Sequence, residues 1–276
     1  MKNSSESTRF DALILAADRH DHDPVAALGS AGCKALTPID GVPMLHRVLG
    51  AINDSKRVGQ VTLIGPSLVL LENDAYVRSL LESDQLRFLA PQASPASSVS
   101  HGLDNRSHWP VLVTTADHAL LRAEMVDYFL AESCKLDCDV TVAVTPLATV
   151  LQRFPGTART AIRLKGGPYC GSNLFTFMTA KGAQVAQYWT GIEEARKRPR
   201  DVVARALGPF LTLWYLLGQL SLEQALARLS KALGVKVGAV VMPFPEAAVD
   251  VDSAKDFALV EQTLHASARS TAGAIS

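Results

Sequence analysis

Short apolar runs alternate with amphipathic stretches along the first half of the chain. Four runs are bounded by polar, Gly or Pro residues and have the length of buried strands: 12–17, 61–64, 111–115 and 140–144. Two stretches between them, 43–52 and 123–131, carry apolar residues at the spacing of a helix face. This alternation predicts an α/β fold with a mainly parallel sheet.

The pattern changes further along the chain. Residues 161–177 contain two strand-like segments joined by a Gly-Gly-Pro turn, and they predict an inserted hairpin layer. Residues 183–233 then have helical periodicity, and Ser221 with Gln224 forms a capping box at the start of the last helix. We expect this part to be a helical elaboration of the fold.

The chain returns to strand and helix near its carboxyl end. A strand is expected at 235–242, followed by a short extended piece at 249–251. Ser253 and Asp256 have the spacing of a helix cap, and the final helix is expected to end at Leu264.

No repeat or linker in the sequence divides this pattern. We therefore predict a single domain over residues 11–266, in which the helical elaboration covers about 183–233. Residues 1–10 are expected to be a disordered tail and residues 267–276 a flexible one.

Composition excludes several classes of protein. The 276 residues include 27 Lys plus Arg and 27 Asp plus Glu, so the net charge is zero and no basic surface for nucleic acid is indicated. The apolar fraction of 48% is that of a soluble globular protein, not of a disordered or fibrous one. The polar start resembles no signal peptide, and the apolar stretch 210–217 is shorter than the ~20 residues that span a bilayer. We expect a cytoplasmic protein without membrane contact.

The loop after the first strand is the first candidate site. It contains neither GxGxxG nor GxxxxGK[ST], which excludes the common dinucleotide-binding and P-loop motifs. It carries instead Lys34-Ala35-Leu36, then Pro38, Gly41 and Pro43-Met44-Leu45. A loop over the carboxyl end of a first strand is where an α/β sheet places its ligand.

Carboxylates follow two other strand-like segments. Asp117 comes just after the run 111–115, and Asp250 and Asp252 lie where the extended piece 249–251 meets the last helix. Carboxylates at a sheet's carboxyl edge are hard oxygen ligands of the kind that Mg²⁺ prefers. Asp117 is equally the kind of residue that caps a following helix.

Together these motifs resemble nucleotidyltransferases of GT-A-like fold, especially the MobA-like group, which transfers a nucleotide onto molybdopterin or another phosphorylated acceptor. The first strand of that family ends in LAAG or LAGG, which is similar to Leu15-Ala16-Ala17 here. The stretch K-A-L-x-P-x-x-G-x-P-M-L then matches from Lys34 to Leu45. Asp18 departs from the family, because it stands where the relatives have Gly.

The resemblance implies a role for several residues. Leu15, Ala16, Ala17 and Lys34 would bind the nucleotide, and Asp117 with Asp252 would hold Mg²⁺. Lys34, Asp117 and Asp252 would thus form the catalytic set. Asp250 is the second choice for the metal, since aligning Ser253 with the family's Thr places Asp252 at the ligand position.

Three further segments have two interpretations each. Ser98 belongs to an S-V-x-x-G-L segment that lies near the nucleotide in relatives, and it also fits a helix N-terminus. Asn173 resembles an acceptor-site residue and also fits a turn. Arg159 and Arg163 are suited to binding an acceptor phosphate, or are solvated charges. His118 is expected to stand behind the metal site or on the surface.

The resemblance thus implies a Rossmann-like (GT-A-like) three-layer sandwich with a mixed, mainly parallel sheet. The implied activity is Mg²⁺-dependent transfer of a nucleoside monophosphate from an NTP to a phosphorylated small molecule, as in the molybdenum cofactor guanylyl- and cytidylyltransferases. An alternative is a catalytically inactive protein that binds a nucleotide or sugar nucleotide. A sugar transferase of the same fold is a further alternative.

Overall fold

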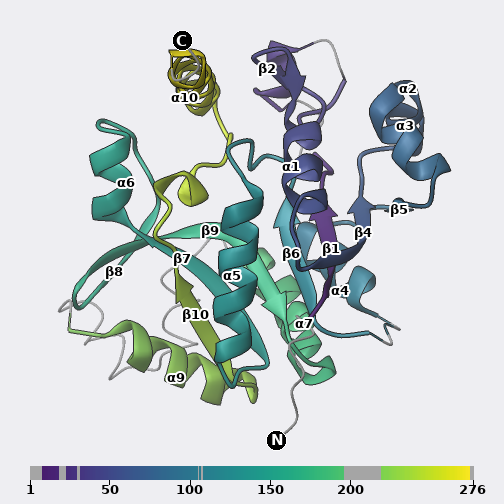
Figure 1. Cartoon of the computed structure of the whole chain (residues 1–276). Coiled ribbons are helices and arrows are strands. Elements are labelled where there is room, and N and C mark those ends of the chain that lie inside the picture. Colours follow the sequence, from purple (N-terminus) through teal and green to yellow (C-terminus); the bar gives the residue numbers. More distant parts are fainter. Residues whose placement is uncertain are drawn as a thin grey trace, which may run out of the picture.

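The computed structural model describes residues 8–18, 23–29, 32–104, 106, 108–195 and 219–273. A central sheet runs through this part of the chain in the order β10-β7-β9-β6-β1-β4-β5, with β8 paired to β9 (Figure 1). Its strands are β1 (Phe10–Leu15), β4 (Val58–Ile64), β5 (Leu86–Leu89), β6 (Val111–Thr115), β7 (Val140–Pro146), β8 (Ala161–Leu164), β9 (Gly167–Phe177) and β10 (Val237–Val241). A separate small hairpin joins β2 (Pro38–Ile39) to β3 (Val42–Pro43).

Helices cover both faces of this sheet. They are α1 (Met44–Asn53), α2 (Leu68–Asn73), α3 (Ala75–Glu82), α4 (Pro95–Leu103), α5 (Ala123–Lys135), α6 (Leu147–Arg153), α7 (Ala180–Ala195), α9 (Leu222–Leu233) and α10 (Ala254–Gly273). Helices α1 and α5 pack on one face, and α4 and α7 pack on the other (Figure 1). The predicted three-layer α/β sandwich with a mixed, mainly parallel sheet is confirmed. No helix in the described ranges is both long and apolar enough to cross a bilayer.

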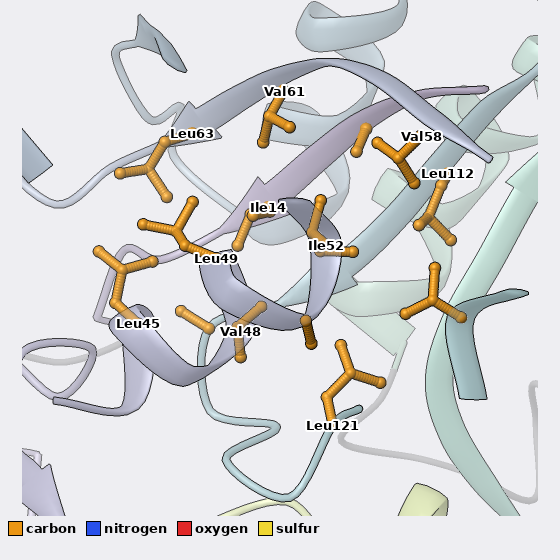
Figure 2. Packing of buried hydrophobic residues seen from close by; sticks show 14 of the residues in the cluster. Ile14, Leu45, Val48, Leu49, Ile52, Val58, Val61, Leu63, Leu112 and Leu121 are labelled. Atoms are coloured by element: carbon orange, nitrogen blue, oxygen red, sulfur yellow. The ribbon is translucent and has the colours of Figure 1, made fainter. Parts of the chain in front are cut away.

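The alternation of side chains along β1 explains the three layers. Ile14 packs in the same cluster as Leu49 and Ile52 of α1, which point toward the strands in Figure 2. Leu13, the neighbouring residue, points to the opposite face and packs in the cluster that contains Val99 of α4. Successive side chains of a strand point to opposite faces, so a fully apolar strand must be buried on both.

Strand β9 corrects the expectation of an inserted hairpin layer. The turn between β8 and β9 exists as predicted, but β9 lies within the central sheet and pairs antiparallel with both β6 and β7. Leu174 and Phe177 of β9 are fully buried on opposite faces of the sheet. The turn residues reveal a hairpin, whereas the partner strands of β9 are set by contacts distant in sequence.

The last helix is longer than predicted. Helix α10 runs to Gly273, so residues 267–273 continue a helix where the sequence predicted a flexible tail. No Gly or Pro interrupts the helix before that residue, and Ser267 Oγ donates to the carbonyl of Thr263 at 3.0 Å. The Ser221 and Gln224 capping box of α9 is confirmed. Residues 196–218 of the expected helical elaboration lie outside the described residues.

Candidate functional site

A cavity opens at the carboxyl ends of β1 and β6, which are neighbouring parallel strands. Its volume is about 240 Å³. Loops that follow the ends of parallel strands form the ligand crevice of α/β sheets. The cavity is lined by Leu15, Ala16, Ala17, Asp18, Asp23, Pro24, Lys34, Ala35, Pro95, Thr115, Ala116, Asp117 and Asp252. The structure therefore brings together the three predicted catalytic residues and the three small residues predicted to contact the nucleotide.

Lys34, Asp117 and Asp252, here called the Lys34 cluster, are joined by direct ion pairs. Lys34 Nζ donates to Asp117 Oδ2 at 2.6 Å and to Asp252 Oδ1 at 2.8 Å. The Lys34 side chain is 13% exposed, and that of Asp252 is 57% exposed. Burial opposes the charged ammonium, but the carboxylates of Asp117 and Asp252 outweigh burial and raise the pKa of Lys34. Lys34 is therefore a cation at neutral pH, in contact with the side chains of Asp117 and Asp252.

Three separate parts of the chain place this cluster. Asp117 lies two residues after the end of β6. Its backbone carbonyl accepts the N–H of Val251 at 3.1 Å, and this bond anchors the segment of Asp252 beside Asp117. Lys34 precedes the β2–β3 hairpin, whose turn residues Asp40 and Gly41 have φ of 52° and 74°. An Asp-Gly pair favours this left-handed turn. The N–H of Leu45 then donates to Ala35 at 2.9 Å and fixes the Lys34 segment against α1.

Asp18, the departure from the family, is tied to the same segment. Its two carboxylate oxygens accept the backbone N–H of Lys34 at 3.0 and 3.2 Å. Burial raises the pKa of Asp18, and the charge of Asp23 adds to the effect. Asp18 thus remains in the cavity wall, where its carboxylate binds a backbone donor. Arg19, the arginine that follows Asp18 in the sequence and a candidate phosphate ligand, lies outside the described residues.

A second group of charges, here called the Arg159 cluster, consists of Arg159, Asn173, Asp250 and Asp256. Arg159 Nη1 donates to Asp250 Oδ1 at 3.2 Å, and Arg159 Nη2 lies 2.9 Å from Asp256 Oδ1. Asn173 Nδ2 donates to Asp250 Oδ2 at 3.1 Å. Burial, followed by the charges of Asp117 and Asp252, raises the pKa of Asp250. Asp250 is therefore engaged by Arg159 and Asn173, whereas Asp252 faces Lys34.

The cluster resolves the alternatives for its residues. The Arg159 side chain is only 7% exposed, so the solvated interpretation is wrong for it. Asn173 has φ of 46° but lies within strand β9, where the pairing with β7 is irregular, so it does not hold a turn, and its side chain donates to Asp250. Arg163 is exposed on β8 and stands outside the cluster. The predicted cap at Ser253 is present, since Ser253 Oγ accepts the N–H of Asp256 at 3.3 Å.

Two predicted residues are buried away from the cavity lining. Ser98 lies inside α4, and its Oγ accepts the N–H of Gln92 at 2.9 Å. Ser94 caps that helix instead. Contact between Ser98 and a nucleotide stays a prediction. His118 is 1% exposed, so its surface interpretation is wrong, and burial lowers its pKa to about 4.

The Lys34 cluster has the carboxylates expected of a magnesium site in which the substrate supplies some of the metal's ligands. Asp117 Oδ1 is buried and has no hydrogen-bond partner among the described residues. Within those residues, no group of three or more His, Cys, Asp or Glu side chains is placed to hold a metal. Mg²⁺ is commonly bound through one or two carboxylates, with substrate phosphates and water as its other ligands. Asp117 and Asp252 fit that arrangement.

Comparison with known proteins agrees with the fold. Residues 12–170 match the MobA-like NTP transferase domain. A hypothetical transferase from Thermus thermophilus superimposes with a TM-score of 0.74 at 29% identity, over 91% of this chain and 100% of that one. No curated protein matches the chain.

More distant solved structures share the fold. A 4-diphosphocytidyl-2C-methyl-D-erythritol synthase from Anaerococcus prevotii DSM 20548 superimposes with a TM-score of 0.55 at 12% identity, over 94% of this chain and 97% of that one. A CMP:2-keto-3-deoxy-manno-octonic acid synthetase complexed with CTP superimposes with a TM-score of 0.52 at 12% identity, over 95% and 100%. At such identity the similarity shows the fold alone.

Proposed function

The chain belongs to the MobA-like NTP transferase domain family, and we propose that it is a Mg²⁺-dependent nucleotidyltransferase. It transfers a nucleoside monophosphate from an NTP to a phosphorylated small molecule and releases pyrophosphate. The observation that carries this proposal is the Lys34 cluster, in which Lys34 Nζ lies 2.6 Å from Asp117 and 2.8 Å from Asp252 inside the cavity.

The reaction needs positioning and charge neutralisation more than covalent chemistry by the protein. An oxygen of the acceptor phosphate attacks the α-phosphorus of the NTP, and the bond from that phosphorus to the bridging oxygen of the β-phosphate breaks. Pyrophosphate leaves with the electron pair of that bond. A bound Mg²⁺ would supply positive charge that stabilises the negative charge of the phosphates.

The chain's own residues divide this work between them. Asp117 and Asp252 would hold the metal, and Lys34 would stabilise negative charge on the phosphates. Ala16 and Ala17 line the cavity with short side chains, which leave room for the triphosphate to approach the backbone. Leu15 completes that wall at the end of β1.

The acceptor is proposed to bind on the side of the β8–β9 hairpin. Arg163 is exposed there and offers a guanidinium to a phosphate. Asn173 borders the same side through its contact with Asp250. The two ion pairs of Arg159 support a positioning role for it, because both of its partners are carboxylates of this chain.

The first test is binding. CTP, GTP, ATP and UTP are screened for Mg²⁺-dependent thermal stabilisation, and CTP is the first candidate because a neighbouring fold was solved with it. A nucleotide at 100 times its Kd adds about 2.7 kcal/mol to the free energy of unfolding. The Asp117→Asn variant should lose the Mg²⁺-dependent part of this stabilisation.

The second test is turnover. The stabilising NTP is offered with phosphorylated acceptors, molybdopterin first, and pyrophosphate release is followed. Release that requires both substrates and Mg²⁺ supports the transferase. Tight nucleotide binding without pyrophosphate release by any acceptor would favour the inactive binding protein, for which Asp18 in the cavity wall is the specific observation.

A further inference from the structure

The Lys34 ammonium lies where a divalent cation would share the same carboxylate oxygens. It contacts one oxygen of Asp117 and one of Asp252, and these two residues come from segments far apart in the chain. We propose that Lys34 is a displaceable internal cation. Its ammonium holds the carboxylates of Asp117 and Asp252 together, and it leaves them when nucleotide phosphates bind it instead. This inference rests on the proposed function and adds an order to it: metal binding depends on nucleotide binding.

The Lys34 ammonium and a metal ion would exclude each other between these two carboxylates. An ammonium 2.6 and 2.8 Å from the two oxygens occupies the space between them. A magnesium ion bonded to those oxygens at about 2.0 to 2.1 Å would have to stand in that same space. Two cations in contact with one pair of oxygens repel each other strongly. Lys34 and the metal are therefore alternative partners of Asp117 Oδ2 and Asp252 Oδ1.

The charge balance of the Lys34 cluster favours a divalent cation over the ammonium. One ammonium faces two carboxylates, and the charges of Asp117 and Asp252 also reach Asp250. In addition, the buried Oδ1 of Asp117 is unpaired among the described residues. Lys34 brings a single positive charge to the Lys34 cluster. A divalent cation would neutralise it more fully once the ammonium has moved.

The ammonium group of Lys34 can move while the backbone of Lys34 stays in place. The Lys34 N–H is bound by the Asp18 carboxylate, and the next residue is tied to Leu45, so the main chain is held in place. The side chain is a flexible four-carbon stem that ends in a compact charge. Triphosphate oxygens in the cavity would offer that charge a new partner within reach of the same backbone position.

The test measures metal binding rather than turnover. Mn²⁺ is titrated into the full chain, and free Mn²⁺ is read from its electron paramagnetic resonance signal, with and without CTP or whichever NTP stabilises the protein. Binding of Mn²⁺ to the nucleotide alone is subtracted. We expect Mn²⁺ to bind at least about tenfold tighter when the nucleotide is present, a coupling within the usual range for linked sites.

The decisive variant is Lys34→Gln, which removes the ammonium and keeps a polar side chain. It should bind Mn²⁺ without nucleotide about tenfold tighter than the parent does, and nucleotide should then add little. Lys56→Gln is the matched control, because Lys56 is exposed and should leave Mn²⁺ affinity unchanged. Adding Asp117→Asn to Lys34→Gln should abolish the gained affinity, which shows that the metal is at this site.

The outcomes separate this inference from the proposed function. Tight Mn²⁺ binding by the parent without nucleotide overturns the inference, even if pyrophosphate release is normal. Unchanged Mn²⁺ affinity in Lys34→Gln also overturns it. If Lys34→Gln proves unfolded, Lys34→Met replaces it in the same titration, and unchanged Mn²⁺ affinity in that variant overturns the inference. If no NTP binds the parent, the proposed function fails, and a gain in Lys34→Gln still identifies Lys34 as the internal cation.

Discussion

The Lys34 cluster and the Arg159 cluster lie side by side, yet they differ in whether their central cation can exchange its partners. Asp250 and Asp252 are separated by one residue, and each belongs to a different cluster. The Lys34 cluster faces a cavity and includes the half-exposed Asp252. The Arg159 cluster is centred on a guanidinium that is 7% exposed. A compact ammonium on a flexible stem is suited to exchange partners, whereas a planar guanidinium between two carboxylates is suited to hold them.

The largest effect is expected from breaking the Arg159 cluster. Arg159→Met leaves Asp250 and Asp256 without their shared cation, and removing one partner of a buried ion pair costs about 3 to 5 kcal/mol. Urea unfolding should show this loss. Arg163→Met, an exposed arginine on the neighbouring strand β8, should change the free energy of unfolding by less than about 0.5 kcal/mol. Equal losses in the two variants would contradict the distinction between the clusters.

The next effect concerns pH and His118, which follows Asp117. The pKa of His118 falls from 6.5 to about 4 in the folded protein. Between these values the unfolded chain binds a proton that the folded one does not, so stability is retained above pH 6.5 and lost as pH falls toward 4. The loss amounts to about 3 kcal/mol.

His118→Leu removes the contribution of this histidine to the pH dependence of stability, and comparison with the parent measures it. The parent's free energy of unfolding should fall more steeply than the variant's between pH 7 and pH 4.5. His101→Gln, a change at an exposed histidine of α4, should keep the parent's slope. Parallel curves for the parent and His118→Leu would show that His118 is not held neutral by the fold.

Breaking the Lys34 cluster should affect turnover rather than folding. Asp117→Asn is expected to lower Mg²⁺-dependent pyrophosphate release by ~10² or more, as for other lost electrostatic stabilisers. Asp252→Asn should lower it further than Asp250→Asn, because Asp252 faces Lys34 and Asp250 faces Arg159. Melting temperatures check that the variants fold. A larger loss in Asp250→Asn would reverse the assignment of the second metal ligand.

The smallest effect is expected at Asp18. Asp18→Gly removes one negative charge from the cavity wall, and it should tighten nucleotide binding by about fivefold, which corresponds to about 1 kcal/mol. Isothermal titration with Mg²⁺ and the stabilising NTP measures this change. No binding by the parent together with tight binding by Asp18→Gly would contradict an active enzyme and would favour the binding protein.

Much of the fold follows from local patterns, and its departures have a common cause. The apolar strand β6 and the cap at Ser221 are set by neighbours in sequence, and both are present as predicted. The place of β9 between β6 and β7 is not set by neighbours in sequence, since a tight turn does not specify which strands pair with β9. The sequence left the burial of His118 open for the same reason: its neighbours in the fold come from distant segments.

The sequence by itself determined where a candidate carboxylate lies, because an apolar strand that ends in Asp117 carries its carboxylate to the sheet edge wherever that strand lies. It also placed Lys34 in the loop after β1. Only the tertiary structure decided that Lys34 stands between Asp117 and Asp252, and that Arg159 engages Asp250. The physical reason is range: periodicity and capping act over a few residues, whereas a contact between charges depends on how distant segments fold together.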